Sequence, residues 1–69
     1  MKWYVSVMTQ ADGKDYVGID EHYGDEEQEP GFVSLHDSEG AAEAACIKYA
    51  QEHDLPLFAD YRYKEVKDV

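Results

Sequence analysis

The feature that most constrains this chain is a long stretch without a basic side chain. From Asp15 to Ile47, 33 consecutive residues, there are ten carboxylates and neither lysine nor arginine. Six of them fall between Asp20 and Glu29, a run called the acidic segment below. Like charges at this density repel one another and oppose a compact state. Two interpretations follow: a solvated loop whose charge keeps the protein soluble, or a functional surface that meets a basic partner.

Composition limits the fold to one small domain. A chain of 69 residues lies near the lower size limit for folding without disulfides or metal. Its 13% of aromatic residues argue against disorder. The formal net charge of −10 exceeds the magnitude of roughly 2–8 that suits a small domain. Such a field repels nucleic acid and anionic membranes. We therefore expect a single domain over residues 1–69 that binds a basic protein.

Cysteine content and hydropathy indicate the compartment. The single cysteine, Cys46, excludes an intramolecular disulfide and a zinc site built from several cysteines. The first ten residues, MKWYVSVMTQ, show no cleavage-type ending, so we expect no signal peptide. No run approaches 18 apolar residues. We expect a cytoplasmic protein, and a monomer.

The first half of the chain reads as strands. WYVSVMT (residues 3–9) is rich in aromatic and β-branched residues. Asp12-Gly13 is a hairpin signal, and the return strand is predicted from Asp15 to Tyr23. A third strand is predicted over residues 32–35 with Val33 and Leu35 inward, continuing a meander if the acidic segment loops back over the sheet edge.

The second half predicts one helix and one more strand. Asp37 or Ser38 suits the N-cap, and the helix should run to about His53. Its apolar stripe, at helical spacing, is made almost wholly of small residues that face the sheet: Ala42, Ala45, Cys46, Tyr49 and Ala50. Alternation from Leu57 to Val66 predicts a fourth strand. The fold class is α+β: a small antiparallel β-sheet of three to four strands with one helix packed on one face, in the order β-β-β-α-β.

Catalytic and metal chemistry find little support. Cys46 lies on the stripe that faces the core, and this setting predicts an inert thiol. No carboxylate has an apolar setting that would raise its pKa for acid–base work. EF-hand ligand spacing fails from both Asp12 and Asp15. We expect no enzyme activity, no cofactor and no dedicated metal site, although loose Ca²⁺ association with the acidic segment stays open.

Carboxylates at alternate strand positions would stand ~6.6 Å apart. Duplex DNA carries one charge per ~1.7 Å of its axis. A rigid row of carboxylates therefore presents negative charges in a line, as the DNA backbone does. Such a row can occupy the Lys/Arg groove of a DNA-binding protein and exclude the duplex. Tyrosines that flank the segment suit an interface, or they simply cover the sheet edge. The predicted partner-binding residues are Tyr16, Asp20, Glu21, Tyr23, Asp25, Glu26, Glu27, Glu29, Glu39 and Glu43.

A small, strongly acidic, cysteine-poor domain with the run IDEHYGDEEQEPG resembles the phage-encoded anti-CRISPR proteins that act as DNA mimics. Those directed at type I Cascade complexes, including type I-C, are nearest in character. The resemblance implies binding to a basic DNA-entry or PAM-recognition surface of a Cas subunit in the host cytoplasm, without chemistry. The run FVSLHDSEGAAEAACIKYAQEH is also similar to the core of HicB-like antitoxins, which implies the neutralisation of a basic toxin. This chain lacks the DNA-binding segment appended to those antitoxins.

Overall fold

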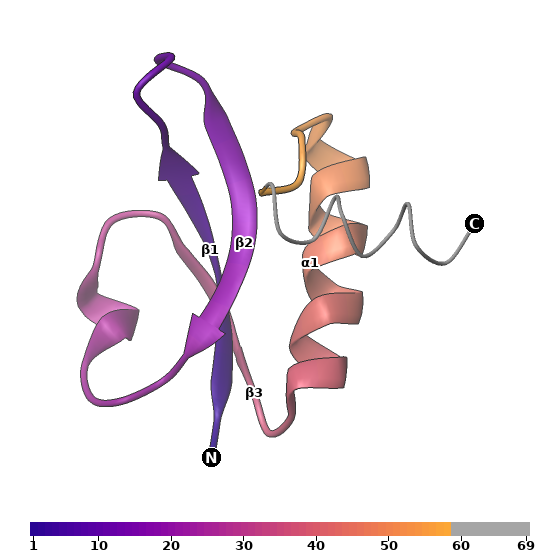
Figure 1. The fold of residues 1–69 in the computed structure, drawn as a ribbon. Coiled ribbons are helices and arrows are strands. Elements are labelled where there is room, and N and C mark those ends of the chain that lie inside the picture. The colour runs from indigo at the N-terminus through magenta and orange to yellow at the C-terminus, as the bar shows by residue number, and fades with distance from the viewer. Residues whose placement is uncertain (59–69) are drawn as a thin grey trace.

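The computed structural model describes residues 1–58. In this part of the chain, three antiparallel strands form a sheet and one helix packs on one face of it (Figure 1). This α+β fold confirms the predicted class. The elements, in chain order, are β1 (Trp3–Thr9), β2 (Asp15–Glu21), a 3₁₀ turn η1 (Glu26–Gln28), β3 (Phe32–His36) and α1 (Glu39–His53).

The sheet order corrects the predicted meander. The strands lie in the order β2-β1-β3, so β1 is central and both neighbours run antiparallel to it. Strand β2 ends at Glu21, opposite Trp3, whereas β3 begins at Phe32, opposite Ser6. The chain between them must therefore travel back along β1. Residues 22–31, called the crossover loop below, are long enough to cross a face of the sheet, so β3 pairs with the second edge of β1.

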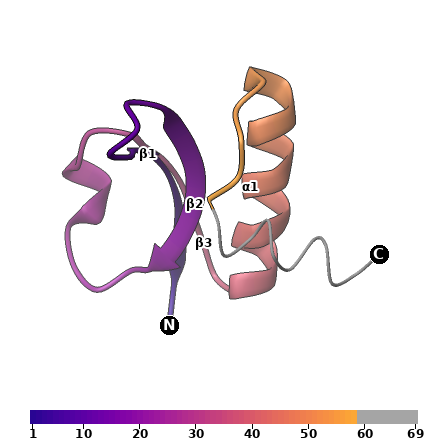
Figure 2. The same cartoon turned by 45° about the horizontal axis from the view of Figure 1, so that its top comes forward.

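The crossover loop lies on the face of the sheet opposite α1. Figure 1 shows η1 and the rest of the loop on one side of the strands and α1 on the other. Figure 2, turned by 45°, shows the same separation. Helix α1 therefore covers one face of the sheet, and the crossover loop lies on the other, where η1 packs on β3. The layers are helix, sheet and acidic loop.

Gly31 fixes the point where the loop rejoins the sheet. Its φ is +90°, and a Cβ at this position would lie 2.3 Å from the carbonyl oxygen of Val7. The Val7 amide donates a hydrogen bond to the Gly31 carbonyl over 2.8 Å. Only glycine combines a positive φ with so close a backbone approach.

The register between β1 and β3 shifts just after Gly31 in the chain. Ser6 pairs with Phe32, but Val5 pairs with Ser34, so Val33 is the extra residue of a bulge. Val33 packs against the core, as predicted. The face of the sheet that carries the crossover loop is called the loop-side face below. Leu35 pairs with Tyr4 and projects to this face with it, because directly opposite residues project to the same side. The prediction that Leu35 faces inward with Val33 is wrong, because the bulge breaks the alternation.

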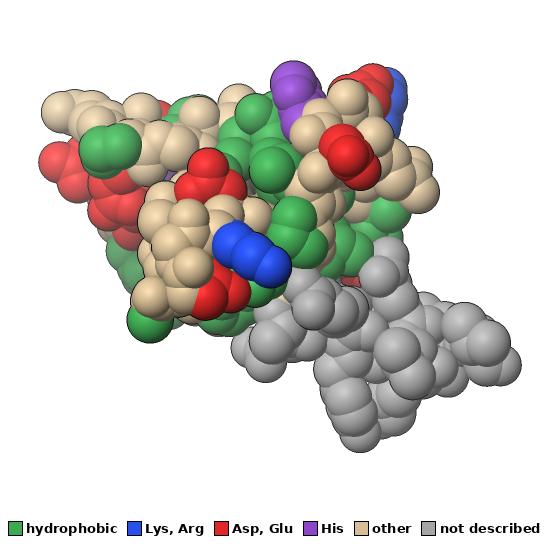
Figure 3. Space-filling model, turned by 90° about the horizontal axis from the view of Figure 1, so that it is seen from above, with side chains coloured by type: hydrophobic (Ala, Val, Ile, Leu, Met, Phe, Trp, Pro, Cys, Tyr) green, Lys and Arg blue, Asp and Glu red, His purple; other side chains and the backbone are tan. Residues whose placement is uncertain are grey.

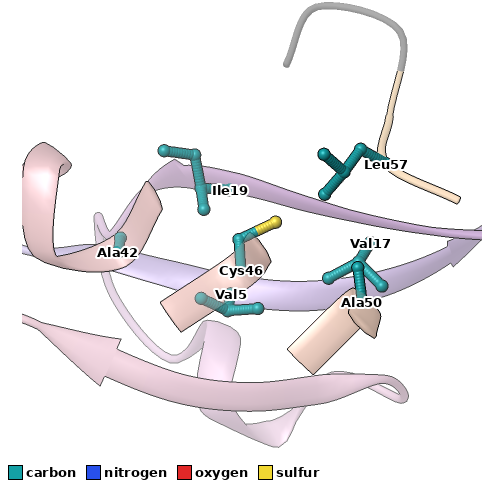
Figure 4. Close-up of a cluster of buried hydrophobic side chains, with 7 residues drawn as sticks. All are labelled: Val5, Val17, Ile19, Ala42, Cys46, Ala50 and Leu57. Carbon is teal, nitrogen blue, oxygen red and sulfur yellow. The ribbon is translucent and has the colours of Figure 1, made fainter. Parts of the chain in front are cut away.

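The core between sheet and helix is built from small side chains. Figure 4 shows Val5, Val17 and Ile19 of the sheet facing the helix residues, with Leu57 closing one end. On α1 the buried residues are Ala42, Cys46 and Ala50, three members of the predicted stripe, and Ala45 and Tyr49 are half-buried against them. The helix begins after Ser38, whose hydroxyl accepts the Ala41 amide hydrogen over 3.2 Å. Ser38 is one of the two predicted N-caps.

The predicted fourth strand is described only at its start. Leu57 forms a parallel bridge with Val17, on the outer edge of β2. The Val17 amide donates to the Pro56 carbonyl (3.0 Å), and the Phe58 amide donates to the Val17 carbonyl (2.8 Å). The chain after α1 therefore returns beside β2. Residues 59–66 of that prediction lie outside the described residues.

Candidate functional site

The loop-side face brings most of the predicted acidic residues into one layer. Residues 1–58 hold thirteen of the sixteen carboxylates and three of the six basic side chains, so this part carries the whole formal net charge of −10. Figure 3 shows acidic side chains gathered at the left, the side on which the crossover loop lies in Figure 1. The predicted residues at the end of β2 and in the loop are Asp20, Glu21, Tyr23, Asp25, Glu26, Glu27 and Glu29. Asp20 lies opposite Tyr4 and shares the loop-side face, whereas Glu21 lies opposite Trp3 and projects to the side of α1.

Glu26 organises the first turn of the loop. Its carboxylate accepts the Gly24 amide hydrogen over 2.8 Å and the Tyr23 amide hydrogen over 3.2 Å. The side chain is only 17% exposed. These bonds, the one from Gly24 above all, lower the pKa of Glu26 below its ordinary value. The ionised Glu26 carboxylate therefore holds the turn through these bonds.

His22 and Glu27 tie the end of β2 to η1. The His22 ring nitrogen Nε2 lies 2.9 Å from Glu27 Oε1 and 3.7 Å from Glu26 Oε1. The hydrogen bond with His22 lowers the pKa of the Glu27 carboxyl. The imidazole also meets Tyr4 edge to face, with ring centroids 6.3 Å apart. The loop is thus held by its own side chains, without a lysine or arginine of the described residues.

The remaining acidic side chains at the end of β2 and in the loop differ in how they are held. The Tyr23 hydroxyl donates to the Glu21 carboxylate, and this bond raises the pKa of Tyr23. Tyr23 is 75% exposed, so its ring is displayed to solvent. Asp20 accepts the Glu21 amide hydrogen over 2.8 Å. Asp25 and Glu29 are exposed, and Asp25 makes no side-chain bond to η1 although it is the N-cap.

Three predicted residues lie elsewhere. Glu39 and Glu43 belong to α1, which covers the opposite face of the sheet (Figure 2). Tyr16 lies near the hairpin end of β2, where its hydroxyl donates to Asp12 over 2.7 Å. The predicted set is therefore split. Glu39 and Glu43 lie across the sheet from the loop, and Tyr16, which shares the loop-side face with its partner Met8, lies at the far end of β2 from the acidic loop.

A groove on the loop-side face was not predicted from the sequence. It has a volume of about 470 Å³ and lies between the end of the crossover loop and the β1–β2 surface. Its walls include Asp15 and Asp20 of β2 and Glu29 of the loop, with Tyr4 and Met8 of β1. The Asp12-Gly13 turn signal sets the hairpin register, which places Tyr4 opposite Asp20. The approach of Glu29 depends on the path of the loop, which no local pattern encodes.

The described residues limit the chemistry of this face. Among them, no three His, Cys, Asp or Glu side chains come together in a way that could hold a metal ion. Cys46 is buried in the core. Within residues 1–58, no helix has the length and apolar character needed to cross a membrane.

Comparison with known proteins adds no assignment. A scan against protein-family models, a search of curated proteins and a search of solved structures each found no match.

Proposed function

We propose that this chain is a non-enzymatic inhibitor that binds a basic surface of a nucleic-acid-binding protein through its loop-side face, as a DNA mimic in the cytoplasm. The observation that carries the proposal is the folded state of the crossover loop. Its carboxylates form a layer fixed by Glu26 and by the His22–Glu27 contact. A loop that served only to keep the protein soluble would not need such internal bonds.

Fixed charges favour association with a basic partner in two ways. Side chains and loops that are already ordered lose less conformational entropy on binding. A concentrated field of one sign also steers an oppositely charged partner and raises the association rate. Glu26 and Glu27 are negative at neutral pH, as their ordinary pKa of 4.5 already requires, and their hydrogen bonds lower the pKa of both further. Exposed Tyr23 adds aromatic area of the kind enriched at interfaces.

The class of target comes from the resemblance to DNA-mimicking anti-CRISPR proteins. We propose a Cas subunit of a type I Cascade complex, with type I-C as the first candidate, and a DNA-entry or PAM-recognition surface as the contact. DNA is bound there through basic side chains that neutralise phosphates. An acidic layer of the same sign as the duplex would compete for those side chains.

The decisive test is competition with DNA. Immobilised protein is exposed to purified type I-C Cascade, and binding is measured by interferometry over a series of salt concentrations. The expected result is binding that weakens with salt and is lost when the complex is first loaded with duplex carrying its PAM. Equal binding to free and DNA-loaded complex would contradict DNA mimicry. Capture of a small basic ribonuclease from host lysate, without Cascade binding, would instead support an antitoxin.

A further inference from the structure

Tyr4 is a buried tyrosine whose hydroxyl lacks a partner within residues 1–58. The residue is 8% exposed and sits in the central strand, below the crossover loop. Its ring stacks on Phe32 with centroids 6.0 Å apart and meets His22 at its edge. No described residue hydrogen-bonds the hydroxyl. A fully buried oxygen without a partner would count as an unsatisfied polar atom, and residues 1–58 contain none. Solvent therefore reaches this oxygen. Tyr4 lines the groove together with Asp20 and Glu29, and the charges of these two carboxylates act on its hydroxyl.

The groove around that hydroxyl is negative. Asp15, Asp20 and Glu29 line it, and none of its described lining residues is lysine or arginine. Burial, and then the charges of Glu29 and Asp20, raise the pKa of Tyr4. The hydroxyl therefore stays neutral and can accept a hydrogen bond from a cation while it donates to a carboxylate. Met8 and Pro30 add apolar wall to the same groove.

The arrangement suits an extended organic cation better than a metal ion. The described carboxylates are too dispersed to form a metal-binding group. A volume of about 470 Å³ falls within the range of about 300–1,000 Å³ that is usual for ligand pockets. A guanidinium has five N–H donors in a rigid plane and pairs with carboxylates in a bidentate manner. Its methylene stem can lie along apolar wall while the charged head meets oxygen acceptors.

We propose that this groove is a receptor for one arginine side chain of the basic partner, held by Asp20, Glu29 and the Tyr4 hydroxyl. The inference rests on the proposed function for the source of the arginine, but the groove can be tested without any partner. Arginine is preferred to lysine because several acceptors surround the groove and a guanidinium can reach more of them at once.

The test uses an isotope-labelled sample of the protein and a short peptide with a single arginine. Backbone amide shifts of groove residues Ser6, Thr9 and Gly31 should move in a saturable way at millimolar peptide. A peptide with citrulline, a neutral analogue of the same shape, should leave them unchanged. Absence of saturable shifts, or equal shifts with citrulline or lysine in place of arginine, would overturn the inference.

Two variants assign the contact to the groove. Tyr4→Phe removes the hydroxyl but keeps the ring and the net charge, and it should weaken arginine-peptide binding roughly 3- to 10-fold. Glu29→Gln should weaken it to a similar extent. Glu52→Gln, an exposed residue of α1 with the same charge change, should have no effect. Equal affinity of the Tyr4→Phe variant and the parent would overturn the role of the hydroxyl.

The two proposals fail in different ways. If Tyr4→Phe keeps full affinity for the nucleic-acid-binding partner while Asp25→Asn weakens it, the inhibitor function stands and the groove is not the arginine receptor. If the arginine peptide saturates the groove but no DNA-competitive partner is found, the groove stands and the proposed inhibitor function is wrong.

Discussion

His22 Nε2 lies 2.9 Å from Glu27 Oε1, and this contact joins the end of β2 to η1 in the middle of the crossover loop. His22 is only 16% exposed, and its backbone amide donates to the Lys2 carbonyl over 2.8 Å. The imidazole is therefore fixed to the sheet before it meets the loop. Two neighbouring carboxylates, Glu26 and Glu27, converge on it. A segment that would repel itself in isolation is thus folded against the sheet.

Acidification should open the loop before the core unfolds. The pKa values of Glu26 and Glu27 lie below the ordinary glutamate value of 4.5 in the folded protein. Their contribution to stability is therefore present above that pH and is lost as the pH falls through the folded values. The Gly24 amide donates its hydrogen to the Glu26 carboxylate. Its NMR signal should therefore shift in this pH window, while the amide signals of Val5 and Val17 stay in place.

The variant Glu26→Gln provides the control for that experiment. Glutamine keeps a side-chain oxygen that can accept from Gly24, but it does not titrate. The Gly24 amide of this variant should show no transition below pH 4.5. A transition identical to that of the parent would mean that Glu26 does not hold the turn.

Gly31→Ala should destabilise the protein by about 2 kcal/mol or more, because a positive φ and a backbone clash coincide there. The added Cβ would lie 2.3 Å from the Val7 carbonyl oxygen. Gly24→Ala is the matched control, since a Cβ at Gly24 meets nothing within 4 Å; it should change the free energy of unfolding by less than about 0.5 kcal/mol. Urea unfolding of both variants measures the difference. Equal midpoints would contradict the assigned path of the loop.

The face of α1 that packs on the sheet can be tested by overpacking. Ala42 is fully buried, so Ala42→Leu should destabilise by ~1–3 kcal/mol. Ala44 is exposed, and Ala44→Leu should stay within about 0.5 kcal/mol of the parent. Thermal unfolding followed by circular dichroism distinguishes them. If both variants melt with the parent, the helix does not approach the sheet through Ala42.

Local patterns predicted the elements well, because each has a local cause. Alternation and the Asp12-Gly13 turn predicted the β1–β2 hairpin, and the stripe of small residues predicted the buried face of α1. Predicted strand β2 ran to Tyr23, but it ends at Glu21, where the loop turns away around Glu26. Element boundaries of this kind depend on contacts that begin outside the strand.

The sheet order and the layer opposite α1 were not predictable in the same way. Whether β3 pairs with β2 or with β1 is decided by long-range pairing and by the route of residues 22–31, not by the composition of β3. Gly31 was visible as part of a Pro-Gly turn signal, but its contact with Val7 was not. The groove at Tyr4 arises from that route, and so it was missed.

Neutralising exposed carboxylates of the loop tests whether the acidic face binds a partner or only keeps the protein soluble. Neutralising Glu26 or Glu27 would also disturb the loop, so the informative changes are at Asp25 and Glu29, which are exposed. Asp25→Asn with Glu29→Gln should leave the fold intact and slow association with the basic partner about 3- to 10-fold at 0.1 M salt, where the screening length is ~10 Å. The salt dependence of binding should flatten.

As a control, Glu39→Gln with Glu43→Gln also removes two negative charges, but from α1, on the opposite face of the sheet. If the partner docks on the loop side, this pair should change the association rate far less than the loop pair does. A larger effect of the helix pair would move the contact surface to the other face and contradict the assigned site. If both double variants fold and associate as fast as the parent, these carboxylates only keep the protein soluble, and the DNA-mimic proposal is wrong.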